Sequence, residues 1–168
     1  LIVFSRMLTP DERRKVESYL AVKYGITLKG SYLDSDGNLT WDMAENQAYH
    51  HRVTAVGTDT AGSLSQPLSA TSYEESPVYA ALKENGTYHD ANPYNPSSAS
   101  RLLVMGRENG NPMPDRGFTF WGDDDVALAT YTSPTDSLWH VMKRTWMVKT
   151  NVPSKPDSTV ARWTAQGL

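Results

Sequence analysis

The clearest pattern in the chain is Leu8-Thr-Pro-Asp-Glu-Arg-Arg-Lys-Val-Glu-Ser-Tyr-Leu-Ala-Val-Lys-Tyr-Gly-Ile-Thr-Leu28. Thr9 suits the N-cap of a helix, Pro10 the first helical position, and Glu12 follows at the spacing of a capping box. Gly25 suits the position at which a helix ends in the left-handed conformation. The sequence therefore predicts one amphipathic helix, and its core-facing stripe is expected to comprise Val16, Tyr19, Leu20 and Lys23.

The rest of the sequence predicts short strands separated by turns. Asp34-Ser-Asp-Gly-Asn38 lies between Tyr32-Leu33 and Leu39-Thr-Trp41, which is typical of a β-hairpin. Residues 58–76 are rich in Ser, Thr, Gly and Ala, and we expect a long surface connection there, with one irregular strand as an alternative for part of it. Other strands are expected at residues 1–4, 48–57, 101–106, 118–122, 126–131, 138–150 and 159–164. Because strands and helices do not alternate, we expect a mainly β fold, an antiparallel β-sandwich with one N-terminal amphipathic helix.

Composition narrows the classes of function. The chain has 168 residues, a net charge of −3 and scattered basic residues, so we expect no nucleic-acid partner. The apolar runs are too short to span a bilayer, so we expect no membrane insertion. Cysteine is absent, which excludes a disulfide scaffold, a thiolate zinc site and a cysteine nucleophile. We expect the chain to be part of a longer polypeptide.

Several motifs carry a family resemblance. Leu1-Ile-Val-Phe-Ser-Arg-Met-Leu8, running into the helix, resembles the closing strand and exit of a LamG or concanavalin-A-like lectin domain. The stretches that follow resemble an uncharacterised β-rich domain of large surface and secreted proteins of Gram-negative bacteria. They are the helix itself, Leu39-Thr-Trp-Asp42, Ala48-Tyr-His-His-Arg-Val-Thr-Ala-Val-Gly57, Trp121-Gly-Asp-Asp124 and Arg144-Thr-Trp-Met-Val148. His50 and His51 depart from the pattern, since they stand where the family usually has an Asn pair.

The resemblance implies a domain organisation and a location. Residues 1–8 would close a preceding lectin-like domain, residues 9–28 would form a junction helix, and residues 29–168 would form the β-sandwich domain. The implied role is a non-catalytic, extracellular or cell-surface module, structural or adhesive, within a larger bacterial surface protein. Its expected partners are the neighbouring domains of the same polypeptide, with a surface glycan or protein as a further possibility.

Two acidic stretches are candidate calcium sites. Asp34 and Asp36 supply closely spaced oxygen ligands, although a hairpin turn explains the same residues. Asp123, Asp124 and Asp125 place three like charges in sequence, and these need water, a cation or basic neighbours. Both a solvated turn and a bound calcium ion stay open at each stretch.

The alternatives to a structural role rest on loop residues. Tyr88, Tyr94 and Tyr131 are expected in or beside loops, where exposed rings could stack on a sugar, so a carbohydrate-binding module is the first alternative. A polysaccharide-acting enzyme that uses loop carboxylates is the second. The sequence contains no nucleophile motif or phosphate loop, and we expect no enzyme. His50 and His51 are adjacent, so they should point to opposite faces of a strand rather than share a metal.

Overall fold

The structure is a computed structural model that describes residues 2–72, 83–84, 87–88, 101–107, 113–126, 130–132, 140–152 and 159–163. Within that part of the chain, helix α1 (Pro10–Tyr24) is the single α-helix. The predicted caps are confirmed. The Thr9 hydroxyl accepts the Glu12 amide at 3.2 Å, the Glu12 carboxylate accepts the Thr9 amide at 2.9 Å, and Gly25 ends the helix with a φ of 64°.

The buried face of α1 differs from the predicted stripe. Ser18, Ala21 and Val22 are buried, whereas Tyr19 is only partly buried. The Ser18 hydroxyl donates to the Arg14 carbonyl at 2.8 Å and accepts the amide of Leu33 at 2.9 Å, so a polar residue joins the helix to the hairpin. Small side chains on this face allow α1 to approach the sheet closely, which composition alone did not indicate.

The described strands pair antiparallel throughout. One sheet has four strands in the order β12-β9-β3-β4 and another has three in the order β13-β8-β5, while β1-β2, β6-β7 and β10-β11 form separate pairs. The strands are β1 (Tyr32–Leu33), β2 (Leu39–Trp41), β3 (His51–Asp59), β4 (Leu64–Gln66), β5 (Leu68–Ser72), β6 (Lys83–Glu84), β7 (Thr87–Tyr88), β8 (Arg101–Arg107), β9 (Gly117–Asp123), β10 (Thr130–Thr132), β11 (His140–Met142), β12 (Trp146–Thr150) and β13 (Thr159–Trp163).

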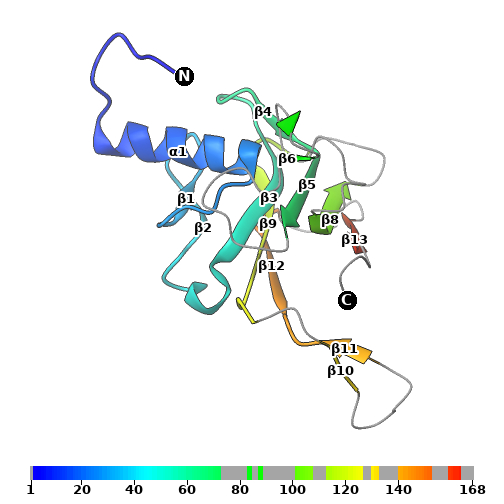
Figure 1. Cartoon of the computed structure of the whole chain (residues 1–168). Coiled ribbons are helices and arrows are strands. Elements are labelled where there is room, and N and C mark those ends of the chain that lie inside the picture. Colours follow the sequence, from blue (N-terminus) through cyan, green and yellow to red (C-terminus); the bar gives the residue numbers. More distant parts are fainter. Residues whose placement is uncertain are drawn as a thin grey trace.

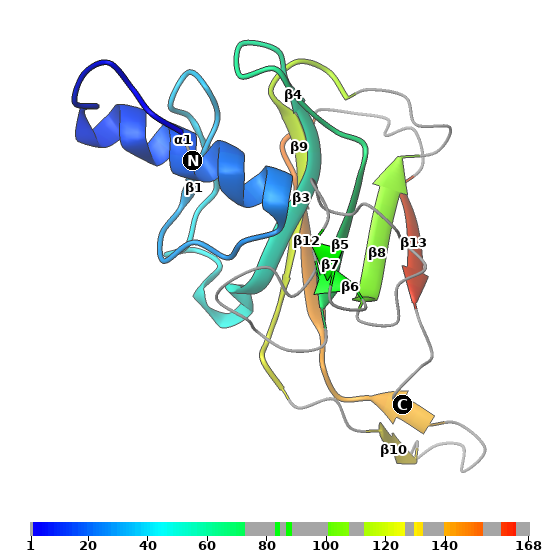
Figure 2. The ribbon, with the colours of Figure 1, turned by 45° about the horizontal axis from the view of Figure 1, so that its top comes forward.

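The four-stranded sheet is covered on both faces. In Figures 1 and 2, α1 and the β1-β2 hairpin lie on one side of it, and β5, β8 and β13 lie on the other. Side chains alternate along β9. Phe118 and Phe120 therefore enter the core under α1, whereas Trp121 enters the second core with Leu103 and Met105 of β8.

The predicted fold class is confirmed in its coarser form. The described chain is mainly β, its sheets are antiparallel, and it carries one N-terminal helix, but the sheets do not close on each other. The hairpin at residues 32–41 is confirmed. The expected surface connection at residues 58–76 is wrong in its described part, because β4 and β5 lie at residues 64–66 and 68–72, while residues 73–76 lie outside the described ranges. The expected strand at residues 48–57 begins later, since Gln47–Tyr49 form a 3₁₀ helix.

Candidate functional site

A cavity of about 400 Å³ lies between α1, the N-terminal segment (residues 2–8) and the four-stranded sheet. Most of its wall is apolar. Val16, Tyr19 and Val22 contribute from α1, Leu64 from β4, and Phe118 and Phe120 from β9. Its size falls within the range of about 300–1,000 Å³ that is typical of small-molecule sites.

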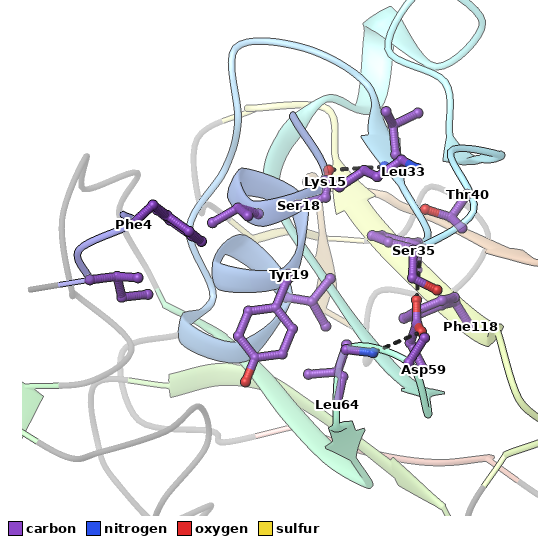
Figure 3. A pocket seen from close by; sticks show the side chains of 16 residues that line it. Phe4, Lys15, Ser18, Tyr19, Leu33, Ser35, Thr40, Asp59, Leu64 and Phe118 are labelled. Atoms are coloured by element: carbon purple, nitrogen blue, oxygen red, sulfur yellow. Dashed lines mark hydrogen bonds between the residues drawn. The ribbon is translucent and has the colours of Figure 1, made fainter. Parts of the chain in front are cut away.

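One wall of the cavity is polar. The Asp59 carboxylate is buried at the end of β3 and accepts the Ser35 amide at 2.8 Å and, at the longer distance of 3.4 Å, the Gly62 amide. The Ser35 hydroxyl is buried and has no hydrogen-bond partner among the described residues. Figure 3 shows Ser35 and Asp59 together on one side of the cavity, with Phe4 on the other.

The N-terminal segment forms the outer wall and forms no strand. Ile2 and Phe4 line the cavity with exposed fractions of 54% and 46%, whereas Val3 and Met7 are exposed at 78% and 90%. The segment thus has one apolar side over the cavity and another that no described residue covers. Its proposed origin in a preceding domain stays a prediction.

An ion pair ties this segment to α1. The Arg6 guanidinium donates to both carboxylate oxygens of Glu12 at 2.8 and 2.5 Å. Hydrogen bonds from Arg6 and from the Thr9 amide lower the pKa of Glu12 to about 2. Glu12 therefore caps the helix and anchors the preceding residues through the same carboxylate.

The first candidate calcium site is a turn whose carboxylates have other partners. Asp34 is buried, and its oxygens accept the amides of Gly37 and Asn38, each at 2.8 Å, and the Asn38 side chain at 2.9 Å. Asp36 instead accepts a hydrogen bond from Arg116 at 3.2 Å. Because the two carboxylates serve different partners, the structure does not bring them to one site.

The second candidate contains a buried ion pair. Arg52 donates through Nε to Asp123 at 2.7 Å, and its terminal nitrogen bonds both Asp123 and Asp125, the latter at 2.7 Å. The register of β3 against β9 shifts between His51 and Thr54, and Arg52 has a φ of 47°. Such a bulge redirects a side chain, and here it aims Arg52 at the end of β9.

Neighbouring groups stabilise the ionised carboxylates of Asp124 and Asp125. Burial alone would raise the pKa of Asp124, but hydrogen bonds from the Thr145 hydroxyl (2.5 Å) and amide (3.2 Å) outweigh it and lower that pKa. The hydrogen bond from Arg52 lowers the pKa of Asp125. Burial, followed by the nearby Arg52 charge, lowers the pKa of Arg144. Basic and hydroxyl neighbours thus stabilise the three adjacent carboxylates, for which the sequence had left water, a cation or basic residues open.

The adjacent histidines have separate environments. His50 is buried and accepts the indole N–H of Trp41 through Nδ1 at 3.0 Å, so its Nε2–H can donate to the Leu28 carbonyl at 2.8 Å. His51 lies nearer the surface, with Nδ1 3.8 Å from Asp125. His50 is therefore a hydrogen-bonding core residue.

The remaining predicted ligands fall partly outside the described residues. Tyr88 lies on β7 and Tyr131 on β10, while Tyr94 lies outside the described ranges. Among the described residues, no group of three or more His, Asp or Glu side chains is arranged to hold a metal ion, and calcium binding stays a prediction. The described helix is neither long nor apolar enough to cross a membrane.

Sequence reasoning missed the residues that define this site. From the sequence we expect Ser35 in a turn, Asp59 in a surface connection and Arg52 in a strand, and none of the three as a site residue. None of them gives a local signal, because their roles depend on contacts with distant segments.

Comparison with known proteins gives one match. A family model described as "Domain of unknown function (DUF8202)" matches residues 12–167, which is most of the chain. No curated protein and no solved structure matches it.

Proposed function

The chain belongs to the DUF8202 family, whose function is unknown, and from its geometry and the resemblance of its motifs to a β-rich domain of bacterial surface proteins we propose that it is a non-catalytic structural module of an extracellular bacterial surface protein. In this role, its N-terminal segment docks onto a preceding domain of the same polypeptide. The observation that carries the proposal is the exposure of Val3 and Met7 on a segment that the Arg6–Glu12 pair holds against α1.

The attachment of α1 supports a rigid junction. The helix buries Ala21 and Val22 in the core above the sheet, and Ser18 hydrogen-bonds the β1 backbone. A domain docked on the N-terminal segment would therefore take up a fixed orientation to the sheet, because the segment is bonded to α1 and α1 is packed on the sheet. Ile2, Val3, Phe4 and Met7 are all exposed large apolar side chains of this one segment, and apolar side chains that are grouped on a surface mark interaction sites.

The hydrogen bonds of the polar candidate residues support a non-catalytic role. Asp34, Asp123, Asp124 and His50 are the kinds of residue that act as acids, bases or ligands, yet each one already bonds other protein groups. These bonds hold turns, strand ends and the core in place. The same groups would have to break structural bonds before they could act on a substrate.

The two larger sheets lie one on each side of a shared apolar core. We propose that the four-stranded and three-stranded sheets are the two layers of a β-sandwich. Packing of Val56 and Trp121 from one sheet against Leu103 and Met105 from the other supports it. A sandwich with a helix on its outer face would suit a domain that fixes the orientation of neighbouring domains in a surface protein.

Hydrogen exchange tests the junction directly. Exchange at residues 2–8 is compared between the 168-residue chain and a longer polypeptide that also carries the proposed preceding domain. We expect slower exchange of these amides in the longer protein, because docking would shield Val3 and Met7. The double variant Val3→Ser/Met7→Ser should lose that protection.

The control introduces a serine in place of an exposed apolar residue outside the N-terminal segment. Val148 on β12 is also an exposed valine, at 55%, and Val148→Ser should leave exchange at residues 2–8 unchanged. Equal exchange of these residues in the short and long proteins would overturn the proposed junction.

A further inference from the structure

We propose that the cavity under α1 binds a small apolar molecule that ends in a hydroxyl or primary ammonium group. The apolar body would lie against Val16, Leu64 and Phe118, and the head group would bond Ser35 and Asp59. This site is separate from the proposed junction, because Ile2 and Phe4 line the cavity whereas Val3 and Met7 do not.

The Ser35 hydroxyl is the observation that points to a ligand. Buried polar atoms nearly always have a hydrogen-bond partner, and an exception calls for an explanation. Ser35 Oγ has none among the described residues, and it is too enclosed for a water-sized group to reach it, although other atoms of Ser35 line a cavity with room for another molecule. Rotation of the Ser35 side chain towards that cavity would let a ligand hydroxyl or ammonium donate to this oxygen.

Asp59 sets the charge of the head group. Its carboxylate accepts the Ser35 amide at 2.8 Å, so the unpartnered hydroxyl and the carboxylate belong to the same wall. Each carboxylate oxygen can accept more than one hydrogen bond, and among the described residues the second oxygen receives only the long bond from Gly62 at 3.4 Å. A second carboxylate placed here would repel Asp59, so an acid should bind poorly.

Two features of the rim bear on entry and selectivity. Ile2 and Phe4 are roughly half exposed on the outer wall of the cavity, so the ligand can enter beside their side chains while the Arg6–Glu12 pair keeps the segment on α1. Lys15 also lines the cavity, and its side chain lies against the turn at Gly37. Lys15 would favour an acid, whereas Asp59 would favour an alcohol or amine. The preferred head group therefore shows which of the two residues the ligand contacts.

Titration calorimetry with three eight-carbon probes tests this choice at about pH 7. The probes are 1-octanol, octylamine and sodium octanoate, which share one apolar chain and differ in the head group. We expect 1-octanol and octylamine to bind at one site per chain, and octanoate to bind at least about tenfold more weakly. No binding by any probe, or octanoate as tight as 1-octanol, would overturn the proposal.

Three variants assign the site. Ser35→Ala should weaken 1-octanol about fivefold, because it removes one hydrogen bond, while Ser65→Ala on the exposed part of β4 should have no effect. Asp59→Asn should weaken octylamine more than 1-octanol. Val16→Phe should abolish binding by filling the cavity.

Melting curves show that each variant is folded. Ser35→Ala removes an unpartnered hydroxyl and should leave the melting temperature unchanged. Unaltered affinity in a folded Ser35→Ala protein would place the ligand elsewhere and overturn the site.

Discussion

Arg52 and Asp123 form a bidentate ion pair whose side chains are exposed by only 5% and 1%. The two residues lie 71 positions apart and meet because β3 and β9 are neighbours. Arg52 also adopts a left-handed backbone, which is costly for a residue other than glycine. The pair thus closes the end of the sheet and offsets the local strain of the bulge.

Removing the arginine should destabilise the fold strongly. Arg52→Met keeps the aliphatic stem but leaves Asp123 buried without its main partner, and we expect a loss of about 3–5 kcal/mol in the free energy of unfolding. Urea denaturation measures it. Arg13→Met is the control, because Arg13 is exposed and lies 3.6 Å from Glu17, and it should cost less than about 0.5 kcal/mol. Equal losses would contradict a structural role for the buried pair.

The adjacent histidines should respond differently to the same substitution. His50→Phe would leave the Trp41 indole N–H and the Leu28 carbonyl without partners, at a cost of about 2–4 kcal/mol. His51→Phe should stay within about 1 kcal/mol of the wild type, since His51 lies nearer the surface. Thermal or urea unfolding of both variants tests the difference, and a more damaging change at His51 would refute it.

Local signals predicted the first part of the fold well. Thr9, Glu12 and Gly25 act within a few residues of one another, so the helix ends could be read directly from the sequence. The buried face of α1 could not, because it depends on what the helix packs against. Ser18 is buried since β1 supplies an amide for its hydroxyl.

The prediction was wrong where tertiary contacts, which local composition does not reveal, decide the structure. Ser69 helped to mark residues 58–76 as a loop, but it lies buried in β5, and its hydroxyl is 2.7 Å from that of Thr54 in β3. A hydrogen bond between strands thus allowed a polar sequence to enter the core. Similarly, the partner of the acidic run is Arg52, and only the pairing of β3 with β9 brings them together.

The capping carboxylate should titrate at low pH. Glu12 has a folded pKa of about 2, below its ordinary value of 4.5, so its ionised form favours the folded N-terminal end of α1. That contribution is complete above about pH 4.5 and is lost as the pH falls towards 2. Carboxyl NMR should find its midpoint near pH 2.

Arg6 is the main cause of that shift, and its removal provides the check. Arg6→Ala should move the Glu12 midpoint up towards 4.5, since it removes the bidentate pair. Arg13→Ala changes another arginine of the same region and should leave the midpoint in place. A Glu12 midpoint near 4.5 in the wild type would show that the pair does not form in solution.

Gly122 should be a glycine of β9 at which no side chain fits. A Cβ atom there would lie far inside van der Waals contact with the Tyr49 carbonyl oxygen and 3.0 Å from Val53 Cγ2. The first obstacle is backbone, so relief requires the 3₁₀ helix before β3 to shift, together with the bulge that aims Arg52. We therefore expect Gly122→Ala to cost at least about 2 kcal/mol in urea denaturation. Gly30→Ala is the matched control, because a Cβ atom there meets nothing within 4 Å, and it should change stability by no more than about 0.5 kcal/mol. A Gly122→Ala protein as stable as Gly30→Ala would mean that the 3₁₀ helix does not pack against β9 as described.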